Sequence, residues 1–184
     1  YMVLGLVGSL IGAAITKYLV VRTGKRVLFI LAAFISGVFS IPLFFLSPDN
    51  LVPIFIFGTI SEFAAGPLPV LFFAMLADSA DYSEWQNNRR ATGLIFSAGS
   101  VAIKFGSGLG GALAGWVLAF YGYVKGGPNS AEALIGVRLI VSVIPALISL
   151  LLMALVWIYK LDENTLMRIE KDLSQRRKQR QEGE

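Results

Sequence analysis

The chain has 184 residues, of which 55% are hydrophobic and only 15% charged, and its mean hydropathy of +0.69 excludes a typical water-soluble domain. It contains no cysteine and no histidine, which excludes thiol catalysis, Ser-His-Asp triads and metal centres with Cys or His ligands. The net charge of +4 does not indicate nucleic-acid binding, because the Lys and Arg residues gather at the ends of apolar runs rather than along one basic face.

Five apolar runs are long enough to cross a hydrocarbon core of ~30 Å, which takes about 20 helical residues. We therefore predict an all-helical integral membrane protein whose five spans cover about 1–21, 27–46, 51–77, 91–121 and 134–159. Short connectors with turn or charge signals separate these runs, so neighbouring spans are expected to pack as hairpins.

Lys and Arg are distributed unequally between the two sides of the membrane. The first and third connectors and the tail together contain 12 of them, whereas Lys125 alone lies on the opposite side. Because positively charged loops stay in the cytoplasm, these connectors and the C-terminus are predicted to be cytoplasmic.

The two ends of the chain also carry information. Tyr1 already lies inside an apolar run, and no basic segment or cleavage site precedes it, so we expect the chain to be the later part of a longer protein. The basic tail, 160–184, carries Leu161, Leu166, Ile169 and Leu173 at near-helical spacing. Two interpretations stay open for it: a short amphipathic helix on the inner membrane surface, or a solvated tail that fixes orientation.

Lys104 lies deep in the fourth run, 13 residues after Ala91 and 17 before Tyr121. A charge near the bilayer centre costs roughly 2.5–3.5 kcal/mol, so such a residue normally faces protein or a water-filled cavity. Residues at spacings of three or four place it on one polar, small-residue helix face with Ser97, Ser100, Ser107, Gly108, Gly111 and Gly115. This face is expected to line a cavity or a close helix contact, and a fixed ion pair without a transport role is the alternative.

Glu62 is the one carboxylate deep inside an apolar run, and it precedes Gly66, Pro67 and Pro69, which weaken the helix there. It is a candidate partner for Lys104. The alternative is a protonated or locally hydrogen-bonded Glu at a kink.

Gly106, Gly108 and Gly111 form a GxGxxG pattern, but a dinucleotide-binding fingerprint needs a preceding strand, and this pattern lies inside a membrane helix. We interpret the glycines as helix-packing positions, as we do Gly8 and Gly12 in the first run.

The third connector contains Asp78, Asp81 and Glu84, followed by Arg89 and Arg90. Ion pairs across the cytoplasmic mouth of a rocking transporter can hold one state and break in the other, so these residues could form a gate. An ordinary interfacial loop with weak exposed pairs is the alternative.

The order of these elements resembles one known family. ADSADYSEW at 77–85, RRATGLIFS at 89–97, a membrane Lys within SVAIKFGSGLGGALAG and a GY turn at 122–123 resemble the glycoside-pentoside-hexuronide:cation symporters of the major facilitator superfamily, which include melibiose permease. The resemblance covers essentially the whole chain and implies the last five of the family's twelve helices.

The resemblance also implies roles for particular residues. Lys104 looks like the family's lysine beside the cation site, and Ser100 stands where a cavity hydroxyl is expected. In contrast, Glu62 and Pro69 differ from the residues of melibiose permease at the matching positions. The residues that look like the cytoplasmic gate motif are Asp78, Asp81, Tyr82, Glu84 and Arg90.

The resemblance implies sugar:cation symport in a bacterial inner membrane, coupled to Na⁺ or H⁺, with a sugar, the cation, the lipid bilayer and the missing N-terminal half as partners. No enzymatic activity, other cofactor, metal site or nucleic-acid partner is expected. Two other classes stay open as alternatives: an intramembrane lipid-processing enzyme with Asp78 and Asp81 as a Mg²⁺-binding pair, and a scaffold or receptor without transport.

Overall fold

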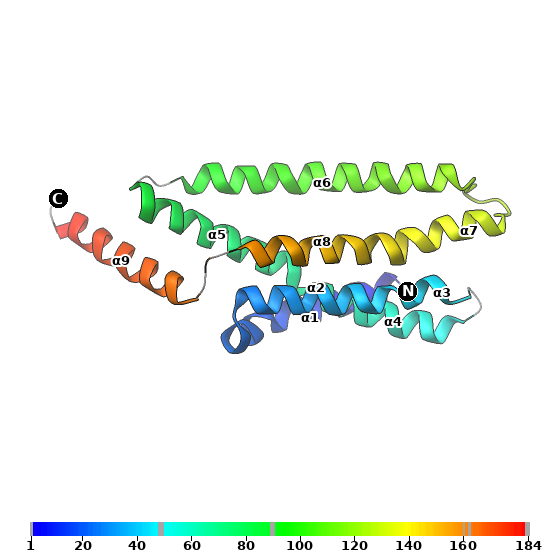
Figure 1. The fold of residues 1–184 in the computed structure, drawn as a ribbon, viewed down its shortest axis with the longest axis horizontal. Helices are drawn as coiled ribbons and strands as arrows, with labels where there is room; N and C mark the ends of the chain where they lie inside the picture. The colour runs from blue at the N-terminus through cyan, green and yellow to red at the C-terminus, as the bar shows by residue number, and fades with distance from the viewer. Residues whose placement is uncertain (1, 48–49, 89–90, 160, 162, 183–184) are drawn as a thin grey trace.

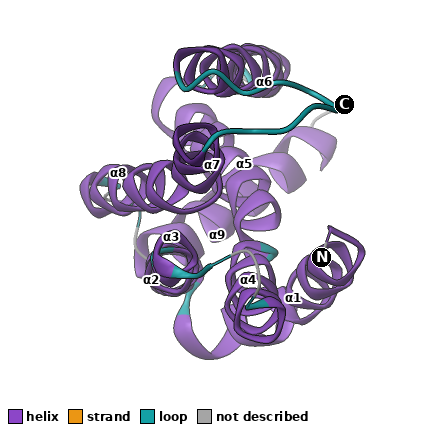
Figure 2. Cartoon of the chain, turned by 90° about the vertical axis from the view of Figure 1, so that its right-hand side faces the viewer, coloured by secondary structure: helices purple, strands orange, loops and turns teal. Residues whose placement is uncertain are grey.

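The computed structural model describes residues 2–47, 50–88, 91–159, 161 and 163–182, and every regular element in these ranges is a helix (Figure 1, Figure 2). In chain order the elements are α1 (Met2–Thr23), α2 (Lys25–Ser40), α3 (Pro42–Phe45), α4 (Leu51–Ala65), α5 (Pro67–Asn87), α6 (Thr92–Phe120), α7 (Ala131–Arg138), the π-helical turn η1 (Leu139–Val143), α8 (Ile144–Ile158) and α9 (Glu163–Glu182).

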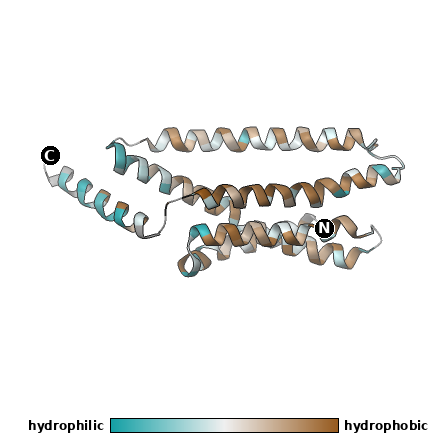
Figure 3. Cartoon of the chain, viewed as in Figure 1, coloured by the Kyte–Doolittle hydropathy of each residue, from teal (hydrophilic) through white to brown (hydrophobic). Residues whose placement is uncertain are grey.

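Five stretches of these helices are long and apolar enough to cross a membrane: Val3–Thr23, Lys25–Phe45, Leu51–Asn87, Thr92–Phe120 and Ala131–Ile158. The predicted all-helical membrane fold with five spans is therefore confirmed. Figure 3 shows the contrast along the chain, since α8 is almost uniformly hydrophobic and α9 is largely hydrophilic.

The third stretch differs from its expected length. Gly66 and Pro67 join α4 to α5 with helical backbone angles, and Pro fits the first turn of α5 because that position needs no hydrogen-bond donor. The helix then continues to Asn87 rather than ending near Ala77. The segment with the predicted gate residues is thus helical, and it ends at Asn88, whose φ of 53° is left-handed.

Close backbone contact joins α1 to the α4–α5 unit. A Cβ atom at Gly12 would lie 2.2 Å from the carbonyl oxygen of Phe63, and one at Gly66 would lie 2.2 Å from the carbonyl oxygen of Ser9. A Cβ atom at Gly8 would lie 3.4 Å from the carbonyl oxygen of Thr59, which is an ordinary van der Waals contact. Both glycines therefore lie at the contact between α1 and α4 as predicted, and at Gly12 only glycine lets the backbones approach so closely.

The interior of the bundle is centred on α2, which packs against α8, α4 and α5. Its core consists of Leu28 and Phe29 of α2 with Leu71 and Met75 of α5. These residues lie toward the end of the bundle where α1 ends, α2 begins, α5 ends and α9 lies, which we call the charged end (left in Figure 1).

In contrast, α6 is mostly uncovered. It packs against α5 near its start, where Gly99 faces the Leu76 side chain, and against α7 near its end, where Tyr121 covers Gly136. Its most apolar stretch contains no buried residue. A Cβ atom at any of the glycines from Gly106 to Gly115 would meet no other group within 4 Å, so the packing expected of them is not made by the described part of this chain.

Candidate functional site

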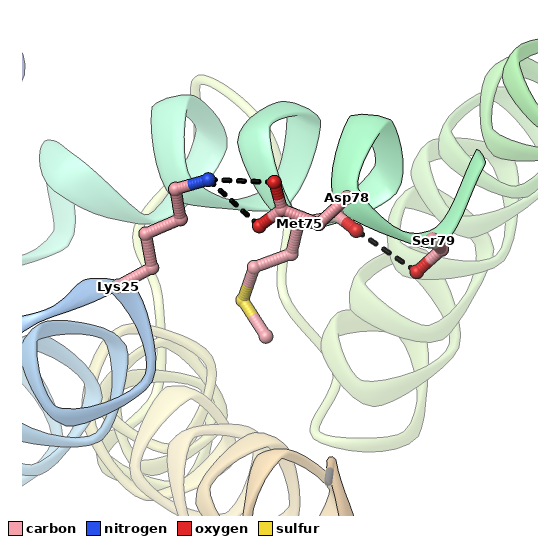
Figure 4. A network of polar contacts seen from close by, with 4 residues as sticks. All are labelled: Lys25, Met75, Asp78 and Ser79. Atoms are coloured by element: carbon pink, nitrogen blue, oxygen red, sulfur yellow. Dashed lines mark hydrogen bonds and ion pairs between the residues drawn. The ribbon is translucent and has the colours of Figure 1, made fainter. Parts of the chain in front are cut away.

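An ion pair at the charged end connects α2 to α5. The Lys25 ammonium lies 2.6 and 2.7 Å from the two carboxylate oxygens of Asp78, and Figure 4 shows both contacts. Gly24, buried and with a φ of 80°, makes the sharp turn that lets α2 begin directly after α1 and places Lys25 over α5. The Asp78 side chain is only 12% exposed and that of Lys25 31%. The pair is thus more protected from water than a surface salt bridge.

The surroundings of this pair are partly apolar. Ser79 donates its hydroxyl to the Met75 carbonyl one turn earlier, and the Met75 side chain is buried beneath (Figure 4). Tyr159, just after α8, packs on the same core. Burial, and then the negative charge of Asp78, raise the pKa of the Tyr159 phenol to about 12. The phenol beside the carboxylate therefore keeps its proton to a higher pH than an ordinary tyrosine does.

Asp81 lies one turn beyond Asp78 and is exposed. It borders a cavity of about 500 Å³ that opens between α2, α5 and α9, whose lining residues are Lys25, Asp78, Asp81, Leu166, Met167, Ile169 and Glu170. Two of the three carboxylates of the predicted gate, Asp78 and Asp81, therefore border one shared cavity, and residues of α9 line its other side.

Two further predicted gate residues lie on the last turns of α5. Tyr82 stacks near Trp85, with ring centroids 6.2 Å apart at an interplanar angle of 38°. Glu84 is half-buried, and its backbone carbonyl accepts the N–H of Asn88 at 2.9 Å, which closes the helix. Arg90, the fifth predicted gate residue, lies outside the described residues.

The spacing of Asp78, Asp81, Tyr82 and Trp85 places them along one face of α5, which the sequence alone indicates once the segment is known to be helical. The sequence did not single out Lys25 as the partner of Asp78. The available signal was that both residues lie beside connectors predicted to be on the same side of the membrane.

The ion pair also bears on the Mg²⁺ interpretation of Asp78 and Asp81. Both oxygens of Asp78 contact the Lys25 ammonium, so a metal ion bound at Asp78 would have to compete with that ammonium. Within the ranges that the structure describes, no group of three or more Asp or Glu side chains could hold one.

Lys104 lies in the middle of α6 and is exposed, without an ion pair or side-chain hydrogen bond in the described part of the chain. Ser100 is exposed one turn earlier and donates its hydroxyl to the Phe96 carbonyl at 2.9 Å. Ser107 likewise donates to the Lys104 carbonyl at 3.0 Å. Lys104 and its neighbouring hydroxyls thus form a polar helix face that the other described residues leave uncovered.

Glu62 does not pair with Lys104, so that expectation is wrong for this chain. Its helix, α4, packs against α1 and α2, whereas α6 packs against α5 and α7. The aliphatic part of the Glu62 side chain lies over Gly5, with Cγ 3.1 Å from where a Cβ atom would be. The residue is nevertheless exposed, one turn before the Gly66–Pro67 junction, and so differs from a carboxyl buried at a kink.

These features define a class before any comparison: an integral membrane bundle with an ion pair at one end and an uncovered polar helix face. Comparison with known proteins then gives the family. The chain belongs to the MFS/sugar transport protein family, which matches residues 1–163. The resemblance to the melibiose permease-like symporters is thereby confirmed, and this is a family of transporters rather than of enzymes.

Individual relatives agree with this assignment. The chain is 36% identical to an uncharacterized 29.9 kDa protein of Pseudescherichia vulneris over 89% of this chain and 60% of that protein. It is 38% identical to the isoprimeverose transporter of Lactiplantibacillus pentosus, over 68% of this chain and 26% of the relative. It is 25% identical to the glucuronide carrier protein homolog of Escherichia coli, over 98% and 40% respectively. The chain therefore spans between about a quarter and three fifths of the length of these relatives.

Proposed function

We propose that this chain is the C-terminal part of a secondary active transporter that performs sugar:cation symport by alternating access. The observation that carries the proposal is the contrast between a closed charged end, held by Lys25 and Asp78, and the uncovered face around Lys104. Alternating access requires contacts that close one end of the bundle and can break when the site faces the other side.

The charged end is proposed to face the cytoplasm of a bacterial inner membrane. The Lys and Arg asymmetry supports this orientation, and one Escherichia coli relative is an inner membrane symporter, 33% identical over 79% of this chain. Asp78, Asp81, Tyr82, Glu84 and Arg90 then form the cytoplasmic gate. The Lys25 partner extends this predicted gate to a second helix.

The substrate and cation are proposed to bind at the membrane midplane, between this chain and the remainder of a longer protein. Lys104, Ser100 and Glu62 are the candidate residues on this side of the cavity. An uncovered ammonium at that depth costs roughly 2.5–3.5 kcal/mol in lipid, which favours a covering protein segment or a water-filled cavity.

The proposed substrate is a glycoside, pentoside or hexuronide, and the coupling ion Na⁺ or H⁺. The names of two relatives support this range, since one is an isoprimeverose transporter and another a glucuronide carrier homolog.

The test is uptake by the full-length protein in membrane vesicles. Labelled isoprimeverose and a labelled glucuronide are offered under an imposed Na⁺ gradient, an imposed proton gradient, or neither. We expect accumulation of one sugar class with one gradient, and its loss when that gradient is collapsed. Uptake equal to that of empty vesicles for every sugar and both gradients would contradict the proposal and favour a scaffold or receptor.

A further inference from the structure

The tail helix α9 is attached to the end of α5 rather than lying free. Ile169 is only 1% exposed and Leu173 4%, and the four-residue spacing puts them on the same helix face. Among the helices, α9 makes its main contacts with α5. In Figure 1 it runs beside the last turns of α5. The apolar face expected to meet the membrane surface is therefore already covered by protein.

Polar contacts reinforce this attachment. The Trp85 indole N–H donates to the Asp172 carboxylate at 3.0 Å. The Arg176 guanidinium donates to the side-chain oxygen of Asn88 at 2.7 Å and to the Trp85 carbonyl at 3.3 Å. That carbonyl belongs to the last turn of α5, where helix carbonyls lack intrahelical partners, and a cation is favoured there.

The attachment lies close to the Lys25–Asp78 pair. Trp85 is seven residues after Asp78, two helical turns along the same face of α5. The first turns of α9 also line the cavity that borders the pair. Any movement of the end of α5 away from α2 must therefore carry α9 with it or break these contacts.

We propose that α9 is a clasp that positions the end of α5 so that Asp78 meets Lys25. The clasp consists of Ile169, Asp172, Leu173 and Arg176 of α9 against Trp85 and Asn88 of α5. Its members are positioning residues, which act on the gate pair through the orientation of α5. The inference deepens the proposed gate, so its test uses readouts that need no sugar.

The first readout is cysteine labelling in the full-length protein, in a cysteine-free background. We expect Ile169→Cys to react with a maleimide at least about tenfold more slowly than Met167→Cys, because Met167 on the same helix is 60% exposed. Trp85→Phe or Asp172→Asn should accelerate labelling of Ile169→Cys about threefold to tenfold, since the first removes the hydrogen bond and the second removes the charge of its acceptor. Asp172→Glu should restore slow labelling.

Glu170→Gln is the matched control, because Glu170 is exposed two residues before Asp172 and makes no hydrogen bond in the described part of the chain. It should leave the labelling of Ile169→Cys unchanged. If Ile169→Cys and Met167→Cys are labelled at equal rates in the protein without further substitutions, the proposed clasp is wrong.

The second readout tests positioning. Cross-linking of the pair Lys25→Cys/Asp78→Cys with a short bifunctional maleimide reports how closely the ends of α2 and α5 approach, and it does not require the two Cα atoms to lie within the roughly 7 Å that a direct disulfide needs. Addition of Asp172→Asn or Trp85→Phe should slow cross-linking about threefold or more, whereas Glu170→Gln should not. An unchanged rate, together with faster labelling of Ile169→Cys, would show that α9 docks without positioning α5 and would overturn the inference. Failure of sugar uptake alone would contradict only the proposed function, since neither readout involves sugar.

Discussion

The charged end and the middle of α6 both carry charged residues in a membrane protein, but they differ in whether those residues have partners. At the charged end Lys25 meets Asp78, and Asp172 meets the Trp85 indole. In α6 the ammonium of Lys104 has no partner among the described residues, and the glycines beside it touch no other helix. The described residues of the charged end thus pair with one another, whereas no described residue covers the α6 face around Lys104.

We propose from this difference that the two regions contribute in two different ways. Pairs made within one bundle can open or close that bundle's end, so their loss should change how states are populated. A charge left unpaired by its own bundle should act on groups contributed from elsewhere, so its loss should change binding and coupling directly.

The largest expected effect comes from Lys104→Val in the full-length protein. Cation-driven accumulation of sugar should fall more than about tenfold, while insertion is unaffected because an apolar residue is favoured in lipid. Lys104→Arg should also be impaired, since its planar fork is bulkier and stays charged. The measurement is gradient-dependent uptake normalised to surface expression, with Lys125→Gln, in an exposed turn, as the control. Full uptake by Lys104→Val at normal expression would show that Lys104 is not required for transport.

A second effect separates packed from uncovered glycines. Gly12→Ala places a methyl group 2.2 Å from the Phe63 carbonyl oxygen, so α1 must move away from α4. We expect a loss of about 1–3 kcal/mol of stability, seen as a lower melting temperature in detergent. Gly110→Ala, at a position open to space, should leave the melting temperature unchanged or slightly raised. An equal loss of stability from both substitutions would contradict the claim that the glycines of α1 are packed and those of α6 are uncovered.

The comparison also explains what the sequence could predict. Long apolar runs predicted the five spans, because a span depends on residues close together in the chain. The sequence does not predict the shared helix face of Asp78, Asp81 and Tyr82, because the apolar run ends near Ala77 and the charged segment after it is typical of a connector, whereas α5 continues to Asn87. The Lys25–Asp78 pair joins residues 53 positions apart, and which helices become neighbours depends on packing such as that at Gly12 and Gly66.

The dependence on helix packing also explains why the predicted pairing of Glu62 with Lys104 is wrong and why the sequence did not predict where the tail helix packs. Periodicity assigns a residue to a helix face but does not say which helix covers that face. It therefore identified an apolar stripe that includes Ile169 and Leu173, without indicating that α5 rather than the membrane surface would cover them.

A smaller effect concerns pH. The pKa of Tyr159 is raised to about 12, whereas an unfolded Tyr ionises near pH ~10. The folded protein thus keeps this phenol neutral while the unfolded chain loses its proton, so stability contributed at neutral pH should decline as pH rises from about 10 to about 12. The check is the phenolate absorbance of the folded protein minus that of Tyr159→Phe, which should show Tyr159 no more than about a tenth ionised at pH ~11. Ionisation near pH ~10 would place this side chain in water.

The gate is tested most directly by exchanging the charges of its pair. In the full-length protein, Asp78→Asn and Lys25→Gln should each lower sugar uptake about threefold to tenfold, in line with a partly protected ion pair worth ~1 kcal/mol. Each substitution should also increase the maleimide labelling of cysteines that are reached from the side of the charged end. The exchange Lys25→Asp/Asp78→Lys should recover at least about half of the uptake, because the attraction is restored with its direction reversed. An exchange variant as impaired as the sum of its two single substitutions, at normal surface expression, would contradict a gate held by this pair.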